Sequence, residues 1–296
     1  MNIGPAPKAV KIGRTIGALA GSATLILRRI GADQKVICGF PGRTCRRQPG
    51  WRPALGVVGG TAALIALDPV TAPLIQRPSF QSSLPVRAFN EALNAQNMAG
   101  VINGTPLVAF FAGAIRKDTY LWQTALLAGE AAASAEILAV TMKHLDRRVR
   151  PLDITDGDFS RTWFRTKRRD LGGAGCFPSG HTASAFAIAT IFADRYPQYR
   201  RLALGCAVLI GCSRLSTRAH YPSDVFFGAA LGFSISHFVV APRAGQMPLT
   251  LLDATLMQAT EHIKQQYDQK DGSEANARTA TGAPSAIAVV PASTAQ

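Results

Sequence analysis

The stretch KHLDRRVRP at residues 143–151 ends a long apolar run, and two more polar blocks follow it: PSGH at 178–181 and SRLSTRAHYPSD at 213–224. Apolar segments at 120–142, 182–193, 202–212 and 225–240 lead into or out of these blocks. Such segments predict buried helices. If the helices pack in alternating directions, all three blocks fall at the same end of a bundle. The other end then carries Arg116, Lys117, Arg195, Arg200, Arg201 and Arg243.

The first block supplies cations. Pro151 predicts that the preceding helix stops at or just before Arg150, because proline disfavours helical geometry in the residue before it. In a helix that reaches so far, Lys143 and Arg150 lie seven residues apart and point nearly the same way, with Arg147 close to that line. Both side-chain types bind phosphate oxygens. The alternative is a basic helix end or loop that faces solvent or a membrane surface.

The second block predicts the start of a helix. Ser179 is a plausible N-cap for the segment 182–193. The free backbone amides of such a helix start, together with the positive end of its dipole, favour an anion. His181 falls in the first turn, beside anything bound there. The alternative is an ordinary turn and cap with no ligand.

The third block joins a histidine to a carboxylate. Ser213 and Arg214 end the segment 202–212, and a short loop then carries His220. Ser223 is predicted to cap the next helix, and Asp224 in its first turn can fold back on His220. A carboxylate that holds one ring nitrogen leaves the other free to attack. The alternative is a loop histidine beside an aspartate that serves only the helix dipole.

Together the blocks resemble the signature of the type 2 phosphatidic acid phosphatase family, which includes bacterial acid phosphatases and vanadium haloperoxidases. The family pattern is a lysine, six residues and Arg-Pro; then Pro-Ser-Gly-His; then Ser-Arg, five residues, a histidine, three residues and an aspartate. This chain matches it at Lys143, Arg150, Pro151, Pro178, Ser179, Gly180, His181, Ser213, Arg214, His220 and Asp224.

The resemblance implies an all-helical enzyme that hydrolyses phosphomonoester or pyrophosphate bonds without a metal or other cofactor. It implies His220 as the nucleophile that becomes phosphohistidine, Asp224 as its orienting partner and His181 as the acid for the leaving oxygen. The phosphoryl oxygens would be held by Lys143, Arg150, Arg214, the Ser179 hydroxyl and the Gly180 amide.

We therefore expect an all-α antiparallel bundle of about six helices with the active site at one end. Segments 54–67 and 101–115 would add two helices to the four around the blocks. Residues 1–50, basic and rich in glycine and proline, are expected to be a poorly structured tail. The phosphatase domain would span 51–245, and residues 246–296 would hold a short amphipathic helix and a disordered tail.

A net charge of +14 is typical of proteins that bind nucleic acid. Much of the charge clusters with the three blocks or flanks apolar segments, so we expect a membrane and no nucleic acid as partner. Several segments fall short of the roughly 20 residues of a spanning helix, and Glu130 and Glu136 interrupt one of them. The basic end opposite the blocks favours a bacterial inner-membrane protein whose site faces the periplasm. A basic site end conflicts with that rule, and a soluble periplasmic protein is the alternative.

The expected substrate is a phosphorylated lipid, such as phosphatidate or an isoprenyl pyrophosphate, or a small phosphate ester. Three rival hypotheses remain: a soluble acid phosphatase of broad specificity, a vanadate-dependent haloperoxidase, and a degenerate relative that only binds anionic lipid. The physiological substrate, the oligomeric state, a targeting role for residues 1–30 and a disulfide between Cys176 and Cys212 are left open.

Overall fold

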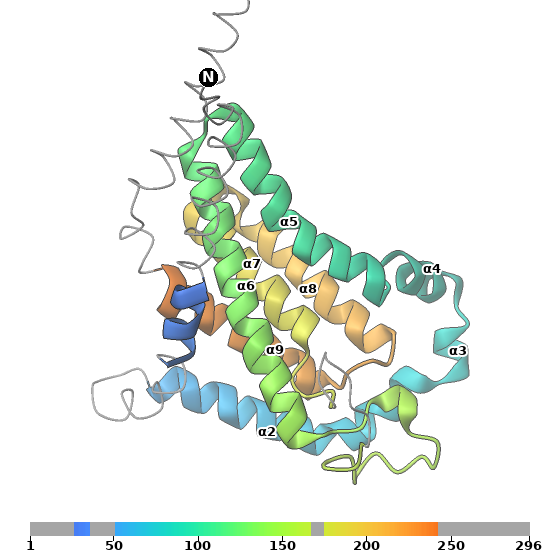
Figure 1. Ribbon diagram of the computed structural model, residues 1–296. Coiled ribbons are helices and arrows are strands. Elements are labelled where there is room, and N and C mark those ends of the chain that lie inside the picture. Colours follow the sequence, from blue (N-terminus) through green and yellow to red (C-terminus); the bar gives the residue numbers. More distant parts are fainter. Residues whose placement is uncertain (1–26, 36–50, 167–174, 242–296) are drawn as a thin grey trace, which may run out of the picture. The chain divides into compact units, whose positions relative to one another are not determined.

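The described part of the protein consists of helices, most of them joined by short loops, with one long connection from α6 to α7 (Figure 1). The computed structural model describes residues 27–35, 51–166 and 175–241, which all belong to one compact unit, Ala23–Gln246. No strand occurs among these residues, so the predicted all-α bundle is confirmed. The six expected segments form α2 (Trp51–Gln76), α5 (Ala95–Arg116), α6 (Thr119–Asp146), α7 (Gly180–Arg195), α8 (Arg200–Ser216) and α9 (Pro222–Ile235).

Shorter elements complete the connections. Two small helices, α3 (Pro78–Gln81) and α4 (Leu84–Ala92), join α2 to α5. Single 3-10 turns, η1 (Pro151–Asp153) and η2 (Pro197–Tyr199), follow α6 and α7, and a π-helical turn, η3 (Ser236–Val240), continues α9.

Helix α7 is the centre of the bundle and packs against α6, α8 and α9. It runs antiparallel to α6, since the Tyr120 hydroxyl near the start of α6 donates to the carbonyl of Arg195 at the end of α7 (2.6 Å). It runs parallel to α9, where Gly232 lies against Ala183 and the Ser236 hydroxyl donates to the Ala187 carbonyl (2.8 Å). Small residues on α7 and α9 let these two backbones approach closely.

Several helix ends differ from the prediction. Helix α2 extends past the expected segment 54–67 because it continues through Pro69 and Pro73, which cost one backbone hydrogen bond each but do not end the helix here. Helix α5 begins before the expected segment 101–115, at Ala95, where the Asn94 side chain caps it by accepting from the Asn97 N–H. Helix α6 stops at Asp146, where Arg147 adopts a left-handed conformation (φ 48°), so the helix does not reach Arg150. The residue that caps α9 is Tyr221, and Ser223 lies inside the helix.

The expectation of a poorly structured tail over residues 1–50 is wrong for residues 27–35, which form a helix against α6. The Gln34 amide donates to the Ser134 carbonyl (3.2 Å), and Arg29 pairs with Glu130 (3.8 Å). The second contact gives Glu130, an acidic residue of α6, a basic partner. The rest of the tail and the predicted segment 246–296 lie outside the described residues.

Three helices are long and apolar enough to cross a membrane, judged by length and composition: Pro53–Gln76, Ala95–Arg116 and Thr119–Asp153. The first two also expose large apolar side chains along their length. These are Leu55, Val58, Leu67, Val70 and Leu74 on α2, and Val101, Leu107, Val108, Phe111 and Ile115 on α5. An apolar surface of this kind fits lipid better than water.

The close contact between α7 and α9 predicts the effect of one methyl group. A Cβ at Gly232 would lie 2.0 Å from the Ala183 carbonyl oxygen, so Gly232→Ala should force the helices apart and destabilise the fold by about 2 kcal/mol or more. The matched control is Gly205→Ala on the exposed side of α8, where a Cβ meets nothing within 4 Å and should leave stability unchanged or slightly higher. Thermal unfolding in detergent compares the two; equal stability would refute the packing argument.

Candidate active site

The three sequence blocks meet at one end of the bundle, because backbone hydrogen bonds connect them. After the undescribed stretch 167–174, Gly175 donates to the Lys143 carbonyl (3.0 Å), and Cys176 donates to the Arg148 carbonyl (2.9 Å). These bonds attach the loop before α7 to the end of α6.

The same loop is also attached to α9. The backbone N–H of Ser179 donates to the Asp224 carbonyl (3.0 Å). The tight fit continues at Gly228, where an added Cβ would lie 2.6 Å from the Ser179 carbonyl oxygen. The ends of α6, α7 and α9 are therefore held in register.

His220 is buried at this junction, with 6% of its surface exposed. Its Nδ1 lies 2.7 Å from the carbonyl oxygen of Cys176. A carbonyl only accepts, so Nδ1 carries the proton and the neutral ring has its lone pair on Nε2. Burial lowers the pKa of His220, and the positive charges of Lys143 and Arg150 lower it further while Asp224 opposes them. His220 is thus held neutral with a defined tautomer.

Asp224 lies beside His220 but bonds elsewhere. Its Oδ2 is 3.6 Å from His220 Nδ1, accepts the backbone N–H of Tyr221 (2.8 Å) and so closes the first turn of α9. Its Oδ1 accepts from Arg148 (2.6 Å). The expected hydrogen bond between Asp224 and the ring nitrogen is therefore replaced by a longer contact, because Nδ1–H donates to the Cys176 carbonyl.

His181 lies in the first turn of α7, as predicted from the second block. Its Nε2 is 3.2 Å from the carbonyl of Ala95, the first residue of α5. Burial lowers the pKa of His181 to about 4, with a further contribution from Arg214 and a smaller one from His220. His220 is therefore near enough to influence the ionisation of His181.

The predicted cations surround the same region. Lys143 is buried on the last turn of α6, and Arg150 lies in the extended segment before η1. Arg214 is buried at the end of α8, where its guanidinium donates to the Leu93 carbonyl and to Ser213 Oγ (2.9 Å). All three reach the histidines electrostatically: Lys143 and Arg150 act on His220, and Arg214 acts on His181.

Ser179 and Gly180 form the start of α7. Ser179 is the N-cap residue, as predicted, although its hydroxyl bonds to Thr182 Oγ1 (2.8 Å) instead of to a free backbone amide. At Gly180, an added Cβ would lie 2.7 Å from both carboxylate oxygens of Glu136 and 3.0 Å from Lys143 Nζ. A larger residue at position 180 would therefore displace the ends of these two side chains.

Sequence reasoning missed two charged residues here. Glu136 was noted only as an interruption of an apolar run, yet its carboxylate lies against Gly180 and accepts from the Ser184 hydroxyl (3.1 Å). Glu136 lies seven residues before Lys143, so both are on one face of α6, and this spacing could have predicted Glu136 at the site. Arg148 points into the junction, whereas the expected Arg147 turns away and bonds the Thr166 carbonyl (2.6 Å).

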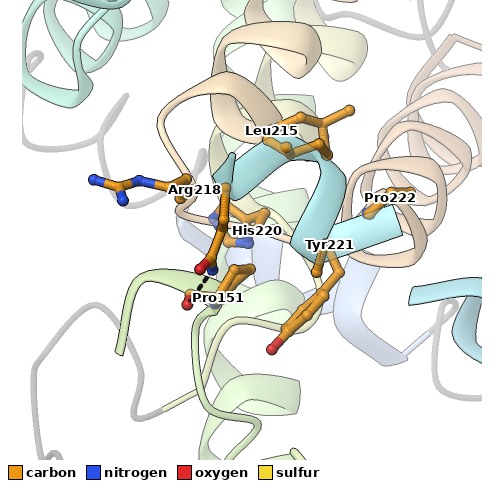
Figure 2. Close-up of a pocket in the computed structure, with 9 residues that line it drawn as sticks. Pro151, Leu215, Arg218, His220, Tyr221 and Pro222 are labelled. Carbon is orange, nitrogen blue, oxygen red and sulfur yellow. Dashed lines mark hydrogen bonds between the residues drawn. The ribbon is translucent and has the colours of Figure 1, made fainter. Parts of the chain in front are cut away.

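A small pocket opens beside His220 (Figure 2). Pro151, Leu215, Tyr221 and Pro222 contribute to its wall, and the side chain of Arg218 points away from the others. The dashed line marks the bond from Gln76 at the end of α2 to the Pro151 carbonyl (2.6 Å). Helix α2 therefore closes one side of the site.

The two cysteines next to the motifs do not pair. Cys176 is buried beneath His220, Cys212 is exposed on α8, and both are free thiols. The contribution of Cys176 to the site is its backbone carbonyl.

Residues 124–245 match the family model of the PAP2 superfamily. The matched stretch contains all three blocks but begins after α2 and α5, so these helices lie outside the family match.

Three curated relatives are lipid A 1-phosphatases. The protein from Rhizobium etli is 37% identical over 129 residues, which cover 43% of this chain and 51% of the relative. The protein from Rhizobium johnstonii is 42% identical over 71 residues (23% of this chain, 29% of the relative), and that from Porphyromonas gingivalis 41% over 76 residues (24% and 17%). The chain thus spans about half, or less, of the length of these relatives.

Among solved structures, a transmembrane PAP2 type phosphatidylglycerolphosphate phosphatase from Bacillus subtilis is similar at 22% sequence identity. The match covers 67% of this chain and 92% of that one, with a TM-score of 0.42.

Proposed function

We propose that this protein is a membrane phosphatase that hydrolyses the phosphate groups of lipids through a phosphohistidine intermediate. The observation that carries the proposal is the buried His220, whose Nδ1–H is held by the Cys176 carbonyl. This contact leaves Nε2 as a nucleophile in a region surrounded by Lys143, Arg150 and Arg214.

In the proposed reaction, His220 Nε2 attacks the phosphorus atom and the bond from phosphorus to the leaving oxygen breaks. His181 protonates that oxygen as it leaves. Water then attacks the phosphorus of the phosphohistidine while His181 accepts its proton, the bond from phosphorus to Nε2 breaks, and inorganic phosphate is released. As Nε2 becomes bonded to phosphorus the ring turns cationic, and the Asp224 carboxylate at 3.6 Å stabilises that charge.

The cations supply the electrostatic part of catalysis. Phosphoryl transfer depends mainly on positioning and on stabilising charge over the phosphoryl oxygens. Lys143, Arg150 and Arg214 serve this role, together with the Ser179 hydroxyl and the backbone amides at the start of α7. The arginines suit bidentate contacts with phosphate, and the buried Lys143 suits a single strong contact.

Lipid phosphates are the proposed substrates because the phosphate site lies at the end of apolar helices. The ends of such helices lie at the membrane surface, where lipid headgroups are. The lipid A 1-phosphatases support this class, and they add lipid A to the phosphatidate and isoprenyl pyrophosphate expected from the sequence.

We further propose that the site faces the periplasm of a bacterial inner membrane. The basic residues Arg116, Lys117, Arg195, Arg200 and Arg201 lie at helix ends away from the site, and such residues favour the cytoplasm. Intact cells should therefore hydrolyse an added charged phosphate ester that cannot cross the inner membrane. Hydrolysis that appears only after the cells are lysed would reverse this orientation.

Replacement of the histidines tests the chemistry. His220→Ala should abolish phosphate release from lipid A, phosphatidate, phosphatidylglycerolphosphate and isoprenyl pyrophosphate in detergent with EDTA, because no nucleophile remains. His181→Ala should lower kcat by about 100-fold for lipid substrates but much less for aryl phosphates, whose leaving oxygens need no acid. Substantial turnover by folded His220→Ala protein would disprove the mechanism.

The pH dependence follows from the two lowered pKa values. His220 must be neutral and His181 protonated, and in the free protein both pKa values lie below 6.5, with that of His181 at about 4. The alkaline limb of the kcat/KM profile should therefore lie below pH 6.5. A bound phosphoryl group adds negative charge and raises the pKa of His181, so the alkaline limb of kcat should lie at higher pH. Limbs that coincide in the two profiles would contradict this assignment.

A further inference from the structure

A buried ionic cluster behind Asp224 includes Asp68 of α2, which lies outside the three blocks. Arg148 is 1% exposed, and its guanidinium donates to Asp224 Oδ1 (2.6 Å) and to Asp68 Oδ2 (2.6 Å). Its Nη1 also donates to the Ser223 hydroxyl (2.8 Å). The rings of Tyr221 and Trp163 lie over the guanidinium, with their centroids 4.0 and 4.5 Å away.

Asp68 brings a charge from a helix that is otherwise apolar. It is the only Asp, Glu, Lys or Arg in the candidate span Pro53–Gln76, and it is 1% exposed. An unpaired carboxylate buried in such a segment costs several kcal/mol, so a lone acid there marks a functional or pairing role. Besides Arg148, Asp68 Oδ1 accepts the backbone N–H of Ser223 (3.4 Å).

The charges of the cluster explain why a second acid is needed. Arg148 alone would hold Asp224 in place but would also offset its negative charge at His220. With Asp68 present, two carboxylates share one guanidinium, and the cluster keeps one net negative charge. Asp224 then remains both fixed and anionic beside the ring.

We propose that Asp68 is a positioning residue for catalysis: it neutralises Arg148, so that Arg148 orients Asp224 without cancelling its charge at His220. The inference rests on the proposed function, since it concerns the same histidine. It adds a contribution from α2, which lies outside the PAP2 match at 124–245.

Asp68→Asn tests the inference, because it removes the charge and keeps a similar shape and hydrogen-bonding groups. We expect kcat to fall about tenfold with KM within about twofold, since Asp68 acts through Arg148 and Asp224 and does not touch substrate. The matched control is Asp194→Asn at the far end of α7, where Asp194 pairs with Arg200 (3.3 Å) and His237 (3.1 Å). This control should keep wild-type kinetics.

The pH profile separates positioning from a merely structural role. The charged groups that act on His220 are Asp224 of α9, Lys143 of α6 and Arg150 of the following segment, and His181 of α7 is also coupled to it. Loss of the Asp68 charge makes the His220 cation less favourable. The acidic limb of kcat/KM in Asp68→Asn should therefore move to lower pH, whereas a loss of folded protein alone would lower the whole profile without moving it.

A measurement without substrate distinguishes failure of this inference from failure of the proposed function. In protein labelled with ¹⁵N-histidine, the His220 signal is assigned by its absence in His220→Ala, and its titration should shift to lower pH in Asp68→Asn but not in Asp194→Asn. Wild-type protein that releases no phosphate would refute the proposed function. An unmoved His220 titration, or Asp68→Asn with kcat within twofold of wild type, would overturn the role of Asp68.

If Asp68→Asn does not yield folded protein, Ser223→Ala provides the test without a change of charge. The Ser223 hydroxyl donates to Asp68 and accepts from Arg148, so its loss loosens the same cluster. We expect a several-fold lower kcat with KM unchanged. Unchanged kcat in this folded variant would also overturn the inference.

Discussion

Arg148 connects parts of the chain that are far apart in sequence. Its guanidinium bridges Asp68 of α2 and Asp224 of α9 at 2.6 Å each, and its backbone carbonyl accepts the N–H of Cys176. Each of these buried ions depends on the others, because an unpaired charge at this depth costs several kcal/mol. Docking of α2 and α9 and construction of the histidine site are therefore coupled. The same ion that stabilises the junction also keeps Asp224 beside His220.

The helices around the motifs were predictable because their apolar runs and polar ends are local properties. Six helices lie where those runs predicted them, and Ser179 is the N-cap of α7 as expected. The ends were less predictable. Helix α2 continues past residue 67 through Pro69 and Pro73, since the remaining helix contacts outweigh the lost bonds, whereas Arg147 ends α6 by adopting a left-handed conformation that nothing in its local sequence required.

Long-range partners explain the remaining differences at the site. The motif predicted a direct hydrogen bond between Asp224 and His220, but the ring N–H donates to the Cys176 carbonyl. Every residue has such a backbone carbonyl, so the sequence does not indicate which one will accept. Asp68 was hidden for a similar reason: its partner Arg148 is 80 residues away in sequence. Short-range spacing identified the residues that meet at the site, while the bonds among them depend on how separate helices dock.

The buried site must hold several positive charges, and the carboxylate of Glu136 lowers the free-energy cost of burying them. Lys143 and His181 are desolvated at the start of α7, and Glu136 lies against the same Gly180 as Lys143, where its negative charge acts on both. Without a bound anion, such a carboxylate reduces the cost of burying cations. A phosphoryl group that enters this region adds negative charge next to Glu136, so Lys143, the arginines and the helix-start amides must outweigh the repulsion from Glu136. Repulsion from Glu136 then favours release of the dianionic phosphate product over tight retention.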